Sequence, residues 1–212
     1  MNVNCENILE RFLVFDPATL YEAAGLRGMV DPSIRPAWPG ARICGVAATV
    51  ECPPADNLML HHAVAAAKPG EVIVAQTGSY LLVGAWGEIL TVAAQERGVT
   101  GLAIDGAVRD IEAIAKHGFP VFSRGLAIGA ATKQRPGRLN VPIQFGGVMV
   151  HPGDIVFGDA DGLVILDREW VEEVYEAAVK RQKREADLIA QLRLGKTTIE
   201  LLGLPALPKQ EV

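Results

Sequence analysis

The feature that most constrains this fold is the segment 101–110, where an apolar run ends at an Asp-Gly pair and is followed at once by Arg109-Asp110. The apolar run suits a buried strand, the glycine permits a reversal, and a helical period begins at Ile111. We therefore expect a strand end, a turn and a helix start, with Arg109 and Asp110 in the first helical turn.

Arg109 and Asp110 together suggest a site for a metal-bound oxo-acid. In open α/β sheets, ligands collect at the carboxyl ends of strands. A guanidinium can bind a carboxylate through two parallel hydrogen bonds, and a carboxylate can hold a hard divalent cation. The alternative is a solvated ion pair, with Asp110 favoured there by the helix dipole. These ten residues alone leave both interpretations open.

The composition indicates an α/β protein that acts on a small molecule. A chain of 212 residues fits one domain with a sizeable core, and it is 50% hydrophobic but only 6% aromatic, so Ala, Val, Ile and Leu must build that core. A net charge of −5 argues against nucleic acid as the partner, because nucleic-acid domains usually carry a basic face. An anionic substrate would then need local positive charge.

The cysteines and the N-terminal sequence predict a reduced, cytoplasmic protein. Cys5, Cys44 and Cys52 are odd in number and lack metal-ligand spacing, so we expect reduced packing residues. The N-terminus has no basic start and no apolar signal core, and no apolar run reaches the roughly 18 residues of a membrane span. We therefore expect no membrane partner.

We expect a single domain, 1–212, in four segments. Residues 1–40 hold N-terminal helices and an arm, 41–166 an α/β core, 167–203 C-terminal helices and 204–212 a tail. Within the first segment, residues 8–13 and 16–25 read as helices, the second with Asp16 as its N-cap. Three prolines in residues 29–40 predict a surface loop or an arm of the kind that often embraces a neighbouring subunit.

Within the core, residues 42–52 predict a central strand buried on both faces, and 148–166 a pair of strands joined by turns. Residues 56–67 predict a capped helix. His61 and His62 lie on it, and adjacent helical positions diverge by about 100°, so packing or surface roles are favoured over a shared metal. The charges of residues 130–139 are expected to be solvated.

A glycine-rich loop at residues 78–90 is the second candidate for ligand binding. Gly84 and Gly87 let the backbone approach a ligand, and the N–H groups from Gly87 to Leu90 would point outward at a helix start, where a carboxylate or keto oxygen fits. The alternative is a glycine-rich turn that merely packs, since the loop carries no phosphate-binding Lys-Ser/Thr.

Several motifs of this chain stand in the order and spacing of one protein group: Asp56-Asn57, Pro69-Gly70, residues 84–90, residues 105–110, residues 119–122, Gly146-Gly147, residues 152–155 and residues 159–162. Their combined spacing resembles the metal-dependent 4-hydroxy-4-methyl-2-oxoglutarate / 4-carboxy-4-hydroxy-2-oxoadipate aldolases, which share their fold with the regulator of ribonuclease E activity. The resemblance covers roughly residues 49–203. Gln76 and the 130–139 loop depart from the group's pattern.

The resemblance implies a swivelling β/β/α sandwich, assembled as a homotrimer or homohexamer with active sites between subunits. Asp110 matches the divalent-metal ligand, with water filling most of the remaining shell. Arg109 matches the residue that binds the oxo-acid substrate. Glu185, on the long C-terminal helix, matches a carboxylate donated by the adjoining subunit.

The resemblance also assigns the loop Gly87-Glu88-Ile89-Leu90, whose backbone N–H groups match those that hold the pyruvate carboxylate. Glu88 stands where the group has an acidic residue near the metal waters. With Arg109 and Glu185, it completes the expected catalytic set.

The implied reaction explains these residue types. Cleaving the C–C bond of a 4-hydroxy-2-oxo acid leaves pyruvate enolate, whose charge needs a Lewis acid or an imine-forming lysine. No lysine lies in either candidate loop, so a divalent cation is expected, Mg²⁺ before Mn²⁺ or Co²⁺. A water ordered by Glu88 or Glu185 would act as the base. Oxaloacetate decarboxylation gives the same enolate.

The main alternative is a non-catalytic regulator of ribonuclease E, a protein-binding trimer. That subgroup typically lacks both acidic residues of the motif, whereas this chain keeps Asp105 and Asp110, which favours the enzyme. A methyltransferase is rejected because no Gly-x-Gly-x-x-Gly turn follows an early strand. A related lyase acting on a different hydroxy-oxo acid stays open.

Overall fold

Strand β2 (Ile43–Glu51) lies in the interior of the main sheet, between β3 and β12, as expected for a central strand. The structure is a computed structural model, which describes residues 5–205 and 207. The sheet order is β1 (Arg35–Pro36), β7 (Val121–Ser123), β5 (Gly101–Ile104), β3 (Glu71–Gln76), β2, β12 (Ile155–Asp159) and β13 (Gly162–Leu166), with β9 (Arg138–Leu139) also pairing β2. Strands β2, β3, β5 and β7 run parallel, whereas β1 pairs antiparallel with β7, β9 and β12 pair antiparallel with β2, and β13 pairs antiparallel with β12.

Two smaller sheets complete the β structure. A parallel sheet, with the order β4 (Gly84–Trp86), β6 (Ala107–Val108) and β8 (Gly125–Leu126), follows the carboxyl ends of β3, β5 and β7. A hairpin of β10 (Ile143–Phe145) and β11 (Val148–Val150) forms the third sheet. The small parallel sheet continues the edge at which ligands of α/β proteins collect.

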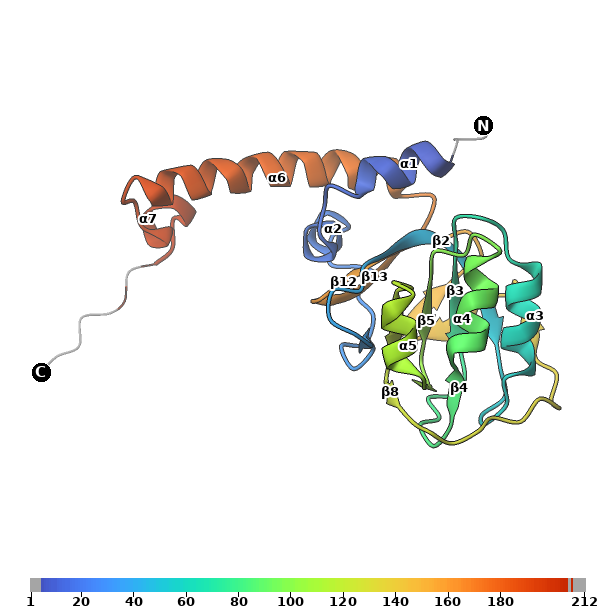
Figure 1. The fold of residues 1–212 in the computed structure, drawn as a ribbon. Coiled ribbons are helices and arrows are strands. Elements are labelled where there is room, and N and C mark those ends of the chain that lie inside the picture. The colour runs from blue at the N-terminus through green and yellow to red at the C-terminus, as the bar shows by residue number, and fades with distance from the viewer. Residues whose placement is uncertain (1–4, 206, 208–212) are drawn as a thin grey trace, which may run out of the picture.

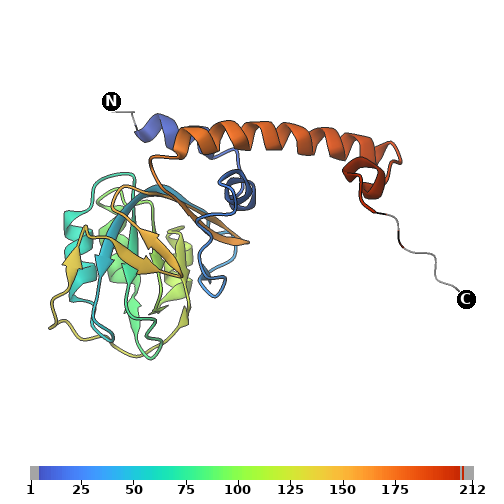
Figure 2. The ribbon, with the colours of Figure 1, turned by 180° about the vertical axis from the view of Figure 1, so that it is seen from behind.

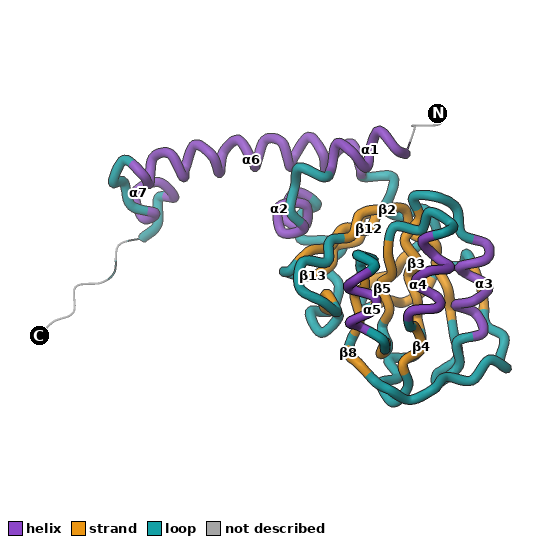
Figure 3. The backbone as a smooth tube through the Cα atoms, in the orientation of Figure 1, coloured by secondary structure: helices purple, strands orange, loops and turns teal. Residues whose placement is uncertain are grey.

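Three helices cover one face of the main sheet: α3 (Leu58–Ala66), α4 (Glu88–Gln95) and α5 (Ile111–Lys116) (Figures 1 and 3). They bury a cluster that includes Trp86, Leu102 and Ile114. On the opposite face, Phe145 of the β10–β11 hairpin packs with Val74 of β3. The layers are therefore β, β and α, which confirms the predicted sandwich.

The terminal helices form a separate layer over β12 and β13: α1 (Cys5–Phe12), α2 (Pro17–Ala23) and α6 (Val171–Arg193), followed by α7 (Thr198–Leu202). Phe12, Phe157 and Val174 share one buried cluster there. Asp16 caps α2 as expected, accepting a hydrogen bond from the Thr19 N–H at 2.7 Å. Beyond this contact, α6 extends far past the sheet (Figures 1 and 2).

Two expectations for the chain path can be compared with the structure. Residues 29–40 form a surface loop, as predicted, which is anchored by buried Val30 and Ile34 and by the pairing of β1 with β7, and contact with a neighbouring subunit stays a prediction. Within residues 148–166, the Asp161-Gly162 turn joins the paired strands β12 and β13, as predicted, but the Pro152-Gly153 turn does not join a strand pair, because β11 pairs with β10 and β12 also pairs with β2. Turn residues at positions 152–153 mark a chain reversal, but sequence does not reveal which strand each segment meets.

The cysteine prediction holds where it can be examined. Cys44 and Cys52 are free thiols, and burial raises the pKa of each to about 12, so both are inert packing residues. The side chain of Cys5 lies outside the described side chains. Among the described residues, no helix is long and apolar enough to cross a membrane.

Candidate functional site

The site forms where β4 and β6 end side by side. Gly84 pairs with Ala107 and Trp86 with Val108, and the Arg109 N–H donates to the Trp86 carbonyl oxygen at 2.9 Å. One residue, Gly87, separates β4 from α4, and two residues, Arg109 and Asp110, separate β6 from α5. Parallel pairing therefore brings the glycine-rich loop and the Arg-Asp pair together.

Asp110 does not lie in the first helical turn, which corrects the sequence-based expectation for it and for Arg109. Asp110 is the N-cap of α5, with φ 58° and ψ 33°, in the left-handed region. Aspartate is one of the few residues that tolerate this region, at a cost of about 1–3 kcal/mol. Such strain in an ordered backbone is typical of functional positions, and it turns the carboxylate toward α4 rather than along its own helix.

The Asp110 carboxylate is held through one oxygen. Its Oδ2 accepts a hydrogen bond from the Glu88 N–H at 3.2 Å and lies 3.6 Å from the Arg109 Nε. The Arg109 and Asp110 side chains are 41% and 44% exposed, so they are open to a ligand. Within residues 5–205 and 207, no donor is found for Oδ1.

Gly84 and Gly87 leave room for this pair. A Cβ atom at Gly87 would collide with Asp110 Oδ2, and one at Gly84 would collide with the Ala127 carbonyl oxygen and crowd the Arg109 side chain. These glycines therefore permit close approach, but the approaching groups are Arg109 and Asp110 themselves.

The first turn of α4 offers free backbone donors, as the glycine-rich loop predicted. The first intrahelical bond runs from the Thr91 N–H to the Gly87 carbonyl oxygen at 3.1 Å. The Glu88 N–H is taken by Asp110. In the described part of the chain, the N–H groups of Ile89 and Leu90 have no acceptor, so they can bind an anion.

The two predicted glutamates are placed differently. Glu88 is half-exposed, and its Oε1 lies 3.1 Å from Nε2 of His117, the C-cap residue of α5, so its carboxylate has a partner. Glu185 lies on α6, where it pairs at 2.9 Å with Arg181, which also pairs with Glu22 of α2. Within one chain, Glu185 does not join the site, and its approach from an adjoining subunit stays a prediction.

Asp105, the other acidic residue of the motif, has a structural role. It is buried, and its Oδ1 accepts hydrogen bonds from the Thr77 N–H at 2.5 Å and the Thr77 hydroxyl at 2.7 Å. Its Oδ2 accepts from the Ser79 N–H at 3.2 Å. Asp105 thus fixes the start of the glycine-rich loop, and it does not line the cavity beside Arg109 and Asp110.

Arg109 and Asp110 line a cavity of ≈100 Å³ together with ten other residues: Asn57, His61, Gly84, Ala85, Gly87, Ile89, Leu90, Ala130, Ala131 and Lys133. At about 30 Å³ per water, this volume holds roughly three waters or a small carboxylic acid. Sequence analysis missed Asn57, His61 and Lys133, because α3 and the 130–139 loop reach the cavity only through the tertiary fold.

His61 and His62 are separated by the helix geometry. His62 is exposed, whereas His61 Nε2 is buried in the cavity wall without a hydrogen-bond partner. Burial, followed by the charges of Lys133 and His62, holds the pKa of His61 below its usual value. His61 is therefore neutral near pH 7, with one ring nitrogen free to contact a ligand.

Arg109 and Asp110 also line a second, larger hollow of ≈680 Å³. Its wall includes the apolar side chains of Leu81, Leu82, Leu126 and Ile128, and Ile128 is 97% exposed. Such an exposed apolar wall next to a polar site is typical of a surface covered by another chain.

A divalent cation fits the donor set at Asp110. Asp110 Oδ1 has no donor among the described residues, whereas the Arg109 guanidinium lies 3.6 Å from Oδ2 and already offsets part of the carboxylate charge, and no described group of three or more His, Cys, Asp or Glu residues forms a dedicated metal cage. Mg²⁺ commonly binds through one or two carboxylates and keeps several waters. The residues present therefore suit an ion held largely by water and substrate.

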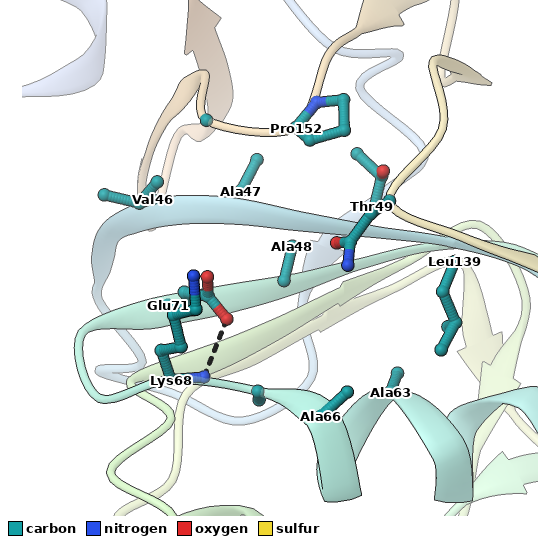
Figure 4. A pocket seen from close by; sticks show the side chains of 13 residues that line it. Val46, Ala47, Ala48, Thr49, Ala63, Ala66, Lys68, Glu71, Leu139 and Pro152 are labelled. Carbon is teal, nitrogen blue, oxygen red and sulfur yellow. Dashed lines mark hydrogen bonds between the residues drawn. The ribbon is translucent and has the colours of Figure 1, made fainter.

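Another cavity, of ≈220 Å³, lies between β2 and α3 (Figure 4). Much of its wall is small and apolar, as shown by Ala47, Ala48, Ala63 and Ala66. Glu71 Oε2 accepts a hydrogen bond from the Lys68 N–H at 2.8 Å. Its polar groups are thus partly satisfied by the protein itself.

The fold and the site define a three-layer α/β protein with a cavity lined by Arg109, Asp110 and Lys133 beyond the carboxyl ends of parallel strands. The chain belongs to the RraA-like family, whose description is Aldolase/RraA and whose model matches residues 14–165.

Three relatives illustrate this membership. A protein of Halalkalibacterium halodurans named "Putative 4-hydroxy-4-methyl-2-oxoglutarate aldolase" is 37% identical over 150 residues, which are 71% of each chain. The crystal structure of an uncharacterized protein from Pseudomonas syringae pv. tomato has a TM-score of 0.82 and 28% identity, covering 92% of this chain and 96% of that one. The RNA-processing inhibitor RraA from Thermus thermophilis has a TM-score of 0.66 and 25% identity, covering 72% and 92%.

Proposed function

We propose that this protein is a divalent-metal-dependent aldolase that cleaves a 4-hydroxy-2-oxo dicarboxylic or tricarboxylic acid to pyruvate and a second oxo acid. The observation that carries the proposal is the Arg109-Asp110 pair, with one carboxylate oxygen free, beside the open first turn of α4. The name of the Halalkalibacterium relative supports the same reaction.

The proposed cleavage has a simple electron balance. The C4 hydroxyl loses its proton, its C–O bond becomes a carbonyl, and the C3–C4 bond breaks. The electron pair of that bond stays with the three-carbon part as pyruvate enolate, which takes a proton at C3. Oxaloacetate gives the same enolate when CO₂ leaves, so decarboxylase activity is a proposed companion.

Asp110 would hold a divalent ion, Mg²⁺ before Mn²⁺ or Co²⁺, which would supply Lewis acidity for enolate formation. Arg109 adds a second positive charge and binds the substrate through its fork of N–H donors. The free N–H groups of Ile89 and Leu90 hold the pyruvate carboxylate. Glu88, or Glu185 from an adjoining subunit, takes the hydroxyl proton through an ordered water.

The decisive experiment measures pyruvate release from 4-hydroxy-4-methyl-2-oxoglutarate, 4-carboxy-4-hydroxy-2-oxoadipate and oxaloacetate. We expect activity that EDTA removes and Mg²⁺ restores. Asp110→Ala should be inactive, whereas Glu112→Ala, two residues away on α5 and outside the cavity wall, should be fully active. Pyruvate release that ignores chelation would exclude the metal-dependent mechanism.

We further propose a homotrimer or homohexamer with sites between subunits. The exposed apolar wall at Leu82 and Ile128 beside Arg109, and the projecting α6, support this assembly. Light scattering should give a mass of three or six chains. Refolding Asp110→Ala together with Glu185→Ala should restore part of the activity, since mixed assemblies would contain sites with both carboxylates intact. No recovery in confirmed mixed assemblies would remove Glu185 from the mechanism.

The competing function is a non-catalytic regulator of ribonuclease E. The family description includes RraA, and the fold matches an RNA-processing inhibitor at a TM-score of 0.66. Retention of Asp105 and Asp110 favours the enzyme. Inhibition of ribonuclease E by the purified protein, with no pyruvate release from any of the three substrates, would reverse this preference.

A further inference from the structure

Helices α4 and α5 lie side by side on one face of the main sheet, and both begin at the candidate site (Figures 1 and 3). Each start supplies a different group: α4 offers the free N–H groups of Ile89 and Leu90, and α5 has Asp110 as its N-cap. Because the proposed substrate would contact both groups, the site depends on how firmly the first turn of α4 is held against α5.

Glu88, the first residue of α4, contacts both ends of α5. Its backbone N–H donates to Asp110 Oδ2 at 3.2 Å, and its side-chain Oε1 lies 3.1 Å from Nε2 of His117, the C-cap residue of α5. An ionised carboxylate can only accept hydrogen bonds, so His117 is the donor to it. A single residue of α4 is thus tied to the start of α5 through its backbone and to the end of α5 through its side chain.

The backbone of His117 is fixed without help from its imidazole ring. Its N–H donates to the Ala113 carbonyl oxygen at 3.0 Å, and its own carbonyl oxygen accepts a hydrogen bond from Gln95 Nε2, at the end of α4, also at 3.0 Å. The His117 side chain is 35% exposed. Replacing the ring should therefore remove the contact with Glu88 and leave the end of α5 in place.

The Glu88 carboxylate is held away from the candidate site. The neighbouring residues Gly87 and Ile89 line the cavity of ≈100 Å³, whereas Glu88 is among the described residues that line neither this cavity nor the hollow of ≈680 Å³. A general base must lie within hydrogen-bond reach of the proton, directly or through one water. A carboxylate bound to His117 does not meet this condition.

We infer that His117 is a positioning residue, which fixes the first turn of α4 against Asp110 by binding Glu88. In this role the Glu88 carboxylate ties the two helices together and does not take the hydroxyl proton, which leaves Glu185 from an adjoining subunit as the candidate base. The inference rests on the proposed function, and it decides between the two bases considered there.

The first test measures pyruvate binding by calorimetry with Mg²⁺ present, which requires no turnover. His117→Ala should weaken binding about 2- to 5-fold, the range of one exposed ion pair. His117→Gln keeps an N–H donor near the position of Nε2 and should retain most of the affinity. Lys116→Ala is the matched control, because Lys116 is an exposed neighbour on the same helix, and it should bind pyruvate as the wild type does.

A double-mutant cycle shows whether His117 acts through Glu88. Glu88→Ala should weaken pyruvate binding about as much as His117→Ala does, and the double variant should bind no more weakly than either single variant. Thermal unfolding should show that all the variants are folded. Losses that multiply in the double variant, or a His117→Ala variant that binds pyruvate like the wild type, would overturn the inference.

Turnover separates a positioning role of Glu88 from a catalytic one. Glu88→Gln keeps an oxygen that can accept from His117, so kcat for pyruvate release should stay within about tenfold of the wild type, whereas loss of a general base costs about 100- to 10,000-fold. A larger fall in kcat with unchanged pyruvate affinity would identify Glu88 as the base and contradict the inference.

Hydrogen exchange keeps this test separate from the aldolase proposal. The Glu88 N–H should exchange several times faster in His117→Ala than in the wild type, because the first turn of α4 opens more easily once its side-chain contact is lost. An unchanged exchange rate would count against the positioning role even in an active enzyme. Absent pyruvate release from every substrate would instead reject the aldolase proposal.

Discussion

The cavity beside Arg109 and the cavity between β2 and α3 sit in the same α/β layers but differ in how their polar atoms are satisfied. The second is about twice as large, at ≈220 Å³ against ≈100 Å³. Around it, the Thr49 hydroxyl donates to the Val141 carbonyl oxygen at 2.6 Å, and Glu71 accepts from the Lys68 N–H. Around the smaller one, Asn57 Oδ1 and His61 Nε2 are left unpaired.

This difference shows that unsatisfied, converging polar groups mark the candidate site better than volume does. Because polar groups of the larger cavity are partly hydrogen-bonded within the protein, a ligand there could form fewer new hydrogen bonds. The alanine side chains of its wall offer a ligand no polar atoms. The smaller cavity combines cations, a strained aspartate and free N–H groups, so a small anion gains several hydrogen bonds at once. The four predictions below test this contrast.

The largest effect is expected at Asp110. Asp110→Asn keeps the shape of the side chain but removes the charge of the proposed metal ligand, so kcat/KM for pyruvate release should fall about 100- to 1,000-fold, the scale of losing one electrostatic stabiliser. The coupled assay measures it, and titration with Mg²⁺ followed by calorimetry should show weakened metal binding. Activity within tenfold of the wild type would mean that Asp110 is not the ligand.

Arg109→Lys should cost somewhat less. Lysine keeps the charge but loses the planar fork, so about 1.5–3 kcal/mol of hydrogen bonding to the substrate is lost, or roughly 10- to 100-fold in kcat/KM. Circular dichroism should confirm an unchanged fold. If the lysine variant has the same kcat/KM as the wild type, the result would support the alternative interpretation that Arg109 and Asp110 form only a solvated ion pair.

Asp56→Ala should change stability more than chemistry. In the variant, the hydrogen-bond donors that bind Asp56, among them the Thr132 hydroxyl and the Gln134 N–H, lose their acceptor. The free energy of unfolding, measured by urea denaturation, should therefore fall by about 1–3 kcal/mol, the cost of one buried unpaired group. The pKa of Asp56 is lowered from 3.8 to about 2, so its contribution is present above pH 3.8 and is lost as pH falls through about 2. A variant whose stability has the same acid dependence as the wild type would contradict this role.

The smallest effect is expected in the other cavity. Ala66→Leu places a larger side chain into the cavity of Figure 4 at an exposed helix position, where both residues are good helix formers. Activity should stay within twofold of the wild type in the pyruvate assay, and stability within about 0.5 kcal/mol. A loss of activity comparable to that of Arg109→Lys would mean that the two cavities are not functionally distinct.

The sequence alone determined much of this molecule, because the relevant signals are local. The alternation of apolar runs, glycines and caps predicted the α/β class, the central β2, the Asp16 cap and the long α6, and the family resemblance predicted the layered sandwich. The Asp-Gly break at residues 105–106 also located the Arg109-Asp110 pair at the end of a strand, next to a helix start.

The tertiary structure decided what lies opposite that pair. Parallel pairing of β4 with β6 brings Gly87 next to Asp110. Asp56 accepts hydrogen bonds from residues 76 to 79 positions further along the chain, and these bonds bring Lys133 to the same cavity. Asp110 combines a left-handed backbone conformation with a hydrogen bond from the Glu88 N–H of α4 to its carboxylate. Such long-range contacts depend on which strands meet, and hydrophobic periodicity carries no information about that choice.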